Sequence, residues 1–181
     1  MKTDSLDRLT APVSRRDHHS GPLNAAAQLL EYGDFECPAC GAAHPLVKAV
    51  REALGQNLCF AFRNFPLVNI HPHAESAAEA AEAAAAQGKY WEMHDTLFEN
   101  QEALDEDDLA RYAAMLAMDS ARLIDEVVNH AHEGRIREDF ASGMRSGVNG
   151  TPTFFINGAR YDGSRDLESM AAALAQPGGL A

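Results

Sequence analysis

The chain has 181 residues, a length that suits one domain or one domain carrying a sizeable insertion. Its formal net charge is −12, which disfavours nucleic acid and anionic membrane surfaces as partners. The sequence has no apolar run long enough for a membrane-spanning helix and no apolar segment near Met1 that resembles a secretory signal. A cytoplasmic location without membrane insertion is therefore expected, or an extracytoplasmic one if a leader has been removed.

The first 24 residues are polar and are expected to form a flexible arm. Residues 27–35 form a strand candidate that leads directly into Cys37-Pro38-Ala39-Cys40. Pro38 suits the first position of a helix, whose apolar spacing continues to Leu54. Residues 58–62 are predicted as a second, buried strand, so the pattern indicates a βαβ unit with parallel strands.

Residues 64–72 are predicted as a loop, and everything from 73 to 147 is predicted to be helical. Helices are expected at 74–87 and 90–98, and Asp105 and Ser120 are expected to cap two more, the second with a break at Gly134. Strand character returns at 153–156, and Asn157-Gly158 is a strong hairpin-turn signal. Asp166 is expected to open a last amphipathic helix. The predicted class is α/β, with residues 25–66 and 148–177 in one domain and 67–147 inserted as a helical domain.

Two of the three cysteines carry the chemistry that this sequence suggests. A CxxC pair in a reducing compartment is either redox-active or half of a metal site. Cys37 would lie where free backbone N–H groups and the helix dipole stabilise a thiolate, so it is the expected exposed attacker. Cys40, one turn further, would be the buried thiol that resolves the mixed disulfide. Cys59 lies in a central strand and is interpreted as a core thiol.

Three acidic residues stand close to this pair in the sequence. Asp34 and Glu36 would oppose a thiolate and raise the pKa of Cys37 if they lie close to it. Glu31 lies within an apolar strand. It is either a buried carboxyl of raised pKa that shuttles protons for Cys40, or a strand-edge residue that faces water.

The histidines give weaker signals. His71, His73 and His94 could suggest a metal site, but no carboxylate or thiol cluster completes a four-ligand set, so no metal is expected. The preferred interpretation places His94 on a helix surface. His44 follows Cys40 by one helical turn and could favour a thiolate when protonated, although a solvent-facing position is the preferred interpretation.

At these residues the chain resembles the DsbA family of the thioredoxin superfamily. The likeness covers about residues 28–174 and rests on four motifs in order: 31–40 (EYGDFECPAC), 62–67 with 71–74 (FRNFPL, HPHA), 90–94 (YWEMH) and 147–155 (GVNGTPTFF). It implies a thioredoxin fold with an inserted all-helical domain.

The resemblance also implies roles for particular residues. Pro152 would have a cis peptide bond and face the active-site pair, and Thr151 would offer backbone groups to an extended substrate. Glu31 matches the position of a buried acid beneath Cys40. The catalytic set would thus be Cys37, Cys40, Pro152 and Glu31. The substrate-binding set would be Pro38, Ala39, Gly150 and Thr151.

The leading hypothesis is disulfide exchange with protein or peptide thiols through a mixed disulfide on Cys37, without a cofactor. A redox partner or small thiol would recycle the pair, and oxidation, reduction and isomerisation all stay open as directions. Three alternatives remain: a glutathione-dependent transferase or isomerase on a related fold, a module that binds zinc or an iron–sulfur cluster, and a redox-sensing domain that binds a partner.

Overall fold

The computed structural model describes residues 8–176, in which five strands form one sheet of order β1-β3-β2-β4-β5. The strands are β1 (His18–Ser20), β2 (Ala27–Gly33), β3 (Leu58–Asn64), β4 (Thr153–Ile156) and β5 (Ala159–Tyr161). β2 and β3 run parallel, as the βαβ pattern predicts, and every other neighbouring pair is antiparallel. The predicted α/β class is confirmed.

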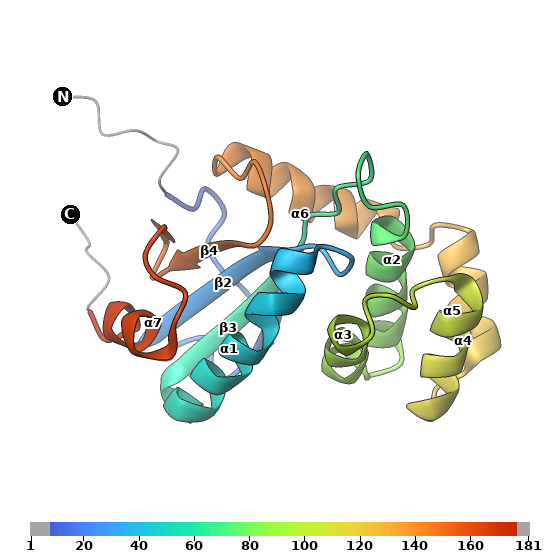
Figure 1. The fold of residues 1–181 in the computed structure, drawn as a ribbon, viewed down its shortest axis with the longest axis horizontal. Helices are drawn as coiled ribbons and strands as arrows, with labels where there is room; N and C mark the ends of the chain where they lie inside the picture. Colours follow the sequence, from blue (N-terminus) through green and yellow to red (C-terminus); the bar gives the residue numbers. More distant parts are fainter. Residues whose placement is uncertain (1–7, 177–181) are drawn as a thin grey trace.

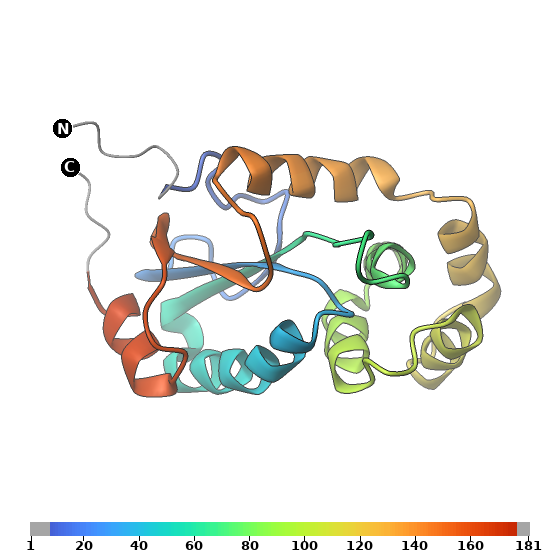
Figure 2. The same ribbon diagram turned by 45° about the horizontal axis from the view of Figure 1, so that its top comes forward.

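Helices cover both faces of this sheet (Figures 1 and 2). α1 (Pro38–Leu54) and α7 (Leu167–Leu174) lie on one face, and α6 (Glu133–Arg145) lies on the other. The remaining helices form a lobe beyond the end of the sheet at which α1 begins: α2 (Ala74–Ala86), α3 (Tyr90–Glu99), α4 (Glu106–Met115) and α5 (Ser120–Val128). Of the helical segment expected at 67–147, α2 to α5 make up this lobe, whereas α6 packs on the sheet. No helix among residues 8–176 combines the length and apolar character that crossing a bilayer requires.

The two central strands are buried on both faces, which explains their almost unbroken apolar sequence. Alternate residues of a strand point to opposite faces. Leu29 of β2 therefore packs in the core under α1, whereas Leu30 and Tyr32 belong to a second cluster on the α6 side. By the same alternation Glu31 points to the α1 side, toward the active-site helix.

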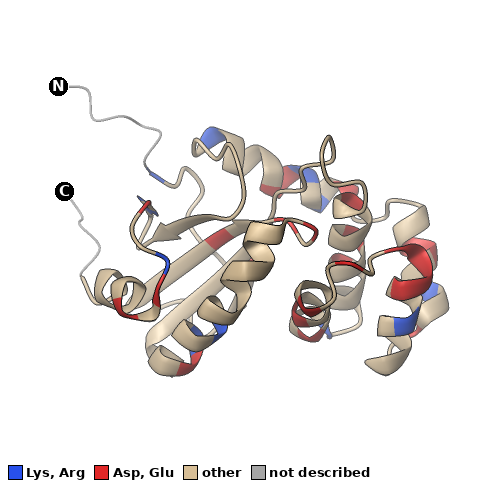
Figure 3. Ribbon diagram, in the orientation of Figure 1, with Lys and Arg blue, Asp and Glu red and all other residues tan. Residues whose placement is uncertain are grey.

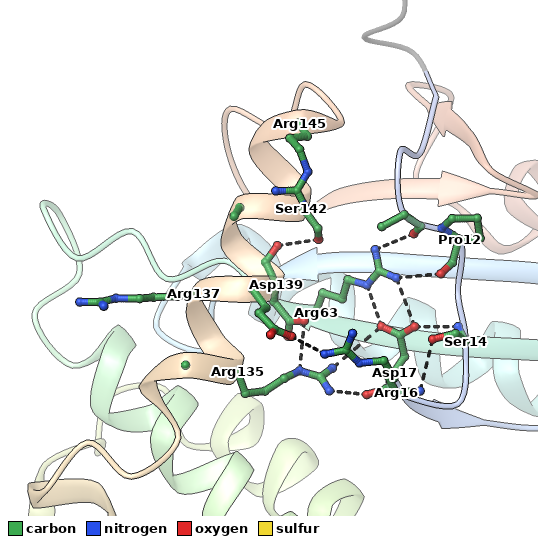
Figure 4. A pocket seen from close by; sticks show the side chains of 14 residues that line it. Pro12, Ser14, Arg16, Asp17, Arg63, Arg135, Arg137, Asp139, Ser142 and Arg145 are labelled. Carbon is green, nitrogen blue, oxygen red and sulfur yellow. Dashed lines mark hydrogen bonds and ion pairs between the residues drawn. The ribbon is translucent and has the colours of Figure 1, made fainter.

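The expected flexible arm at residues 1–24 is wrong for the part that the structure describes, while residues 1–7 lie outside it. Residues 18–20 pair with β3, and the segment before them crosses the α6 side of the sheet. Arg63 of β3 is buried there, and a buried guanidinium requires a charged partner. Its Nε donates to Asp17 Oδ1 at 2.7 Å, and its Nη1 donates to the carbonyl of Ala11 at 2.9 Å (Figure 4). Arg63 thus holds the N-terminal segment against the sheet, where that segment and α6 border a cavity of about 570 Å³.

Local sequence signals account for most element ends. Asp105 and Asp166 cap α4 and α7 by accepting hydrogen bonds from backbone N–H groups, as predicted. The cap of α5 is Asp119 rather than Ser120, because its carboxylate accepts from the N–H of Arg122 at 3.0 Å. That helix ends before His130, which has a φ of 50°, so the expected break at Gly134 is wrong and Gly134 lies within α6.

The Asn157-Gly158 signal is confirmed. The two residues have φ values of 50° and 80° and join β4 to β5, which is the left-handed pair that a tight hairpin turn requires. The first part of the predicted sheet domain, residues 25–66, lies within the described residues, and the second part, 148–177, extends one residue beyond them.

Candidate active site

The CxxC pair lies at the start of α1, at the end of the sheet that meets the helical lobe (Figure 1). Cys37 is the N-cap residue and Pro38 is the first helical residue, where a missing N–H costs nothing. The backbone N–H groups of Cys40 and Gly41 donate to the Cys37 carbonyl at 3.0 and 3.1 Å. All three cysteines are thiols.

The exposure of the two thiols differs, although less than expected. Cys37 is 6% exposed and Cys40 is fully buried. Between them, Pro38 and Ala39 are exposed to solvent. Cys37 therefore reaches the surface only through a small opening, and the expectation of a freely exposed attacker needs that correction.

A proline loop faces the pair, as the resemblance implies. The Thr151–Pro152 peptide bond is cis, and the Cys37 thiol donates to the Thr151 carbonyl across a sulfur–oxygen distance of 3.4 Å. Gly150 lies beside this contact, with its carbonyl bonded to the Thr153 hydroxyl at 2.7 Å and open space on its side-chain face. Residues 114 positions apart in the sequence thus share one site.

The Cys37 thiolate is stabilised by its surroundings, which lower its pKa to about 5. The largest cause is the hydrogen bond from the Cys40 thiol, and the backbone N–H groups of Ala39 and Cys40 add to it against the opposing effect of burial. The Thr151 hydroxyl is buried and has no partner among the described residues, so it is free to donate to the thiolate.

The pKa of Cys37 is lowered, and neither Asp34 nor Glu36 is among the main causes that act on it. The loop between β2 and α1 is acidic (Figure 3), but both carboxylates serve other donors. Asp34 accepts from the N–H of Leu67 at 2.9 Å and from His71 at 2.7 Å, and Glu36 accepts from the N–H of His73 at 2.6 Å. These two acids instead tie the loop after β3 to the active-site loop.

Burial raises the pKa of both Cys40 and Glu31. The Glu31 side chain is 2% exposed, and desolvation raises its pKa to about 8 against the attraction of Arg165. Its Oε1 has no hydrogen-bond partner among residues 8–176. A side chain at Gly33 would meet the Phe62 ring at 2.4 Å and Glu31 Oε1 at 3.2 Å, so glycine is required for this close packing. The buried interpretation of Glu31 is therefore the correct one.

Two site residues were missed by the sequence analysis. Gln101, in the helical lobe, donates from Nε2 to the carbonyls of Phe35 and Cys37, each at 2.8 Å. Arg165 donates to the carbonyl of Pro152 at 3.2 Å. No motif surrounds Gln101, which lies 64 residues beyond Cys37, so only the folded chain reveals that the lobe holds the active-site loop.

The other five residues that the sequence analysis considered lie elsewhere. Cys59 is fully buried as expected. Its neighbour Phe60 points into the core under α1, and because successive strand residues point to opposite faces, Cys59 faces away from α1. His44 and His94 are buried rather than solvent-facing, so both preferred interpretations of their positions were wrong. His71 and His73 bind the loop acids rather than joining His94.

Comparison with known proteins agrees with this geometry. A protein-family model described as thioredoxin matches residues 14–176. Among solved structures, BdbD from Bacillus subtilis superposes with a TM-score of 0.83 at 18% identity, covering 93% of this chain and 96% of that one. α-DsbA1 from Wolbachia pipientis gives 0.79 at 19% identity, covering 93% and 94%. A thioredoxin-like oxidoreductase from Silicibacter pomeroyi gives 0.77 at 25% identity, covering 96% and 95%.

The curated relatives that match this chain in sequence are named as antiporters. The chain is 46% identical over 175 residues to Na(+)/H(+) antiporter NhaA 3 of Salinispora tropica, which is 95% of this chain and 26% of the antiporter. It is 41% identical over 169 residues to NhaA 1 of a Mycobacterium species, which is 92% of this chain and 28% of that protein. The chain thus spans about a quarter of the length of the curated relatives that it matches.

Proposed function

This chain belongs to the thioredoxin family and has the DsbA-like form of its fold, and from that premise we propose that it is a thiol–disulfide oxidoreductase acting on proteins or peptides. The observation that carries the proposal is the position of Cys37, at a helix start and 3.4 Å from the Thr151 carbonyl. Its lowered pKa makes it a thiolate at neutral pH, and the thiolate is the form that exchanges disulfides.

The chemistry proceeds in two exchanges. When the pair is a disulfide, a substrate thiolate attacks the Cys37 sulfur, the Cys37–Cys40 bond breaks, and Cys40 leaves and takes up a proton. A second substrate thiolate then attacks the substrate sulfur of the mixed disulfide and releases the Cys37 thiolate. The substrate loses two electrons to form a disulfide, and the pair gains them. Reduction of a substrate follows the same steps in reverse.

The acidity of Cys37 favours the oxidising direction. A thiol of low pKa is a good leaving group, and a stabilised thiolate makes the reduced pair more stable and the disulfide a stronger oxidant. The pKa of about 5 lies between the values of about 7 and about 3.5 that are typical of thioredoxin and of DsbA. We therefore assign an oxidising role, with Glu31 and Cys40 exchanging the proton beneath the pair.

Apolar side chains beside the site support a polypeptide substrate. Val68 and Ile70 are 52% and 68% exposed, on the loop that Asp34 ties to the active-site loop. An extended substrate backbone would pair with the backbone of Thr151, in place of the contact between its carbonyl and the Cys37 thiol. The exposed Pro38 and Ala39 leave room for a chain to approach Cys37.

Equilibration of the purified protein in glutathione buffers of graded potential tests this proposal. We expect one reversible two-electron transition of the Cys37–Cys40 pair, at a potential above about −270 mV and below about −120 mV. The measurement is alkylation of free thiols followed by mass spectrometry. A pair that stays reduced throughout, or that oxidises irreversibly, would refute the function. A potential at or below about −270 mV would refute only the direction.

We also propose that this chain works together with a Na(+)/H(+) antiporter. Its antiporter-named relatives carry a matching segment within one much longer chain, and segments joined in one protein commonly act on one another. With tagged Cys40→Ser protein in cells, we expect a disulfide-linked adduct with the antiporter in the membrane fraction. Adducts that never include it would argue against this partner. The cytoplasmic location stays a prediction.

A further inference from the structure

Two buried histidines meet beneath the active-site helix. His44 lies on α1 and His94 on α3, they are 6% and 1% exposed, and their ring centroids are 5.6 Å apart. Asp95 adds a carboxylate, with Oδ1 at 2.9 Å from His94 Nδ1 and 3.7 Å from His44 Nε2. One ligand atom from each of the three residues lies within 4.8 Å of the other two.

The Nε2 atoms of both histidines are buried and have no hydrogen-bond partner among residues 8–176. A buried polar atom without a partner is unfavourable, because it has lost its water and gained no hydrogen bond in exchange. Six aromatic rings lie around His94: Phe35, Phe60, Phe62, Tyr90, Trp91 and Phe98. Only Tyr90 carries an oxygen, and that hydroxyl has no partner among residues 8–176. Of the two Nε2 atoms, that of His44 lies within the cluster, 3.7 Å from Asp95 Oδ1 and beyond hydrogen-bond reach of it, so a group placed between them would satisfy it.

We propose that His44, His94 and Asp95 bind a divalent transition-metal ion of the class that prefers imidazole, with zinc as the representative. Two imidazoles and one carboxylate are a ligand set that such ions use in proteins, with a remaining position open to water. A ligand nitrogen must be unprotonated to bind, and the burial of His94 among aromatic rings favours its neutral form.

Access and room for the ion come from the side of Asp95. Its side chain is 30% exposed and lines a cavity of about 330 Å³ together with Lys48 and Arg51. Ligand atoms of one zinc ion lie about 2.0–2.2 Å from it, so the three side chains must close by small rotations on binding. The Asp95 side chain can rotate, because part of it is exposed to solvent.

Two cations oppose the ion. Lys48 Nζ lies 3.9 Å from Asp95 Oδ2, but its nearer partner is Glu99 at 3.0 Å. Arg51 lies over the rings of Phe60 and Trp91, at 5.3 and 4.8 Å from their centroids. Lys48 would keep its contact with Glu99 when the ion binds, but the ion would have to displace it from Asp95. The site therefore predicts that removal of the Lys48 charge tightens metal binding.

Zinc titration of the protein with its Cys37–Cys40 pair oxidised tests the proposal, since a disulfide removes the competing thiolates. We expect one bound ion per chain by calorimetry, and visible absorption from cobalt(II) in the same site. Asp95→Asn should weaken zinc binding by at least about tenfold, because losing even a group behind a ligand costs about 10–100-fold. Lys48→Met should strengthen it.

His130→Asn is the matched control, since His130 is exposed and asparagine tolerates its positive φ. It should bind zinc as the unchanged protein does. His94→Ala would leave a gap among aromatic rings, and that variant could unfold. The test therefore depends on Asp95→Asn and Lys48→Met. Binding that is unaffected by both, or that His130→Asn abolishes, would overturn the site. Absence of binding with an intact redox transition would overturn this site alone and leave the proposed exchange activity standing.

Discussion

Cys37→Ser is expected to abolish disulfide exchange, and Cys40→Ser is expected to accumulate mixed disulfides on Cys37. The first change removes the only thiol of the pair that reaches the surface, while the second leaves the attacker without the thiol that resolves it. Insulin reduction and mass spectrometry of trapped adducts measure the two effects. The activity of Cys37→Ser should fall to the uncatalysed rate.

The third cysteine supplies the control for this experiment. Cys59 is buried on the opposite side of the sheet, so Cys59→Ala should keep the exchange rate and the redox potential. Activity retained by Cys37→Ser would remove that residue from its role as attacker. Adducts that form on Cys59 rather than Cys37 would show that Cys59 attacks the substrate, which would also contradict the assignment.

Glu31 should make the stability of the protein strongly dependent on pH. Burial raises the pKa of this carboxyl from 4.5 in the unfolded chain to about 8 in the folded one. The folded state therefore holds a proton on Glu31 that the unfolded state releases, so the contribution of Glu31 to stability falls as pH rises from 4.5 through 8. A rise from 4.5 to about 8 corresponds to a loss of about 5 kcal/mol from the Glu31 contribution to the free energy of unfolding. In the reduced protein the lowered pKa of Cys37 acts in the opposite direction, so the Glu31 contribution is measured as a difference between variants.

Glu31→Gln removes this dependence, because the amide stays neutral at every pH. Denaturant unfolding of the reduced proteins at pH 5 to 9 measures this effect. The free energy of unfolding of the variant should rise relative to that of the unchanged protein, by several kcal/mol, as pH rises. Exchange turnover should slow, since Cys40 would lose its proton partner. Glu52→Gln, at an exposed glutamate on α1, should leave the pH dependence as it is. A constant difference between Glu31→Gln and the unchanged protein would show that this carboxyl ionises normally.

Features set by neighbours in the chain could be predicted. Pro38 indicates that a helix begins just after Cys37, and Asn157-Gly158 indicates a hairpin turn. Asp105 and Asp166 indicate helix starts. In each case the interaction joins residues no more than a few positions apart, so it appears in the sequence as a spacing.

The errors come from contacts between distant segments. His44 and His94 each stand on an ordinary helix, and nothing near them in the sequence indicates that α1 and α3 bury them against one another. Asp17 lies in a polar stretch typical of a flexible arm, yet Arg63, 46 residues later, holds it in place.

The order of amino acids is enough to show that a CxxC pair starts a helix after a buried strand, because a thiolate, a proline and a helix dipole act over one turn. The contact of Gln101 with the active-site loop, the contact of the Thr151 carbonyl with Cys37 and the burial of Glu31 became visible only in the folded chain. Desolvation and long-range hydrogen bonds depend on which segments pack together, and no local spacing in the sequence encodes that packing.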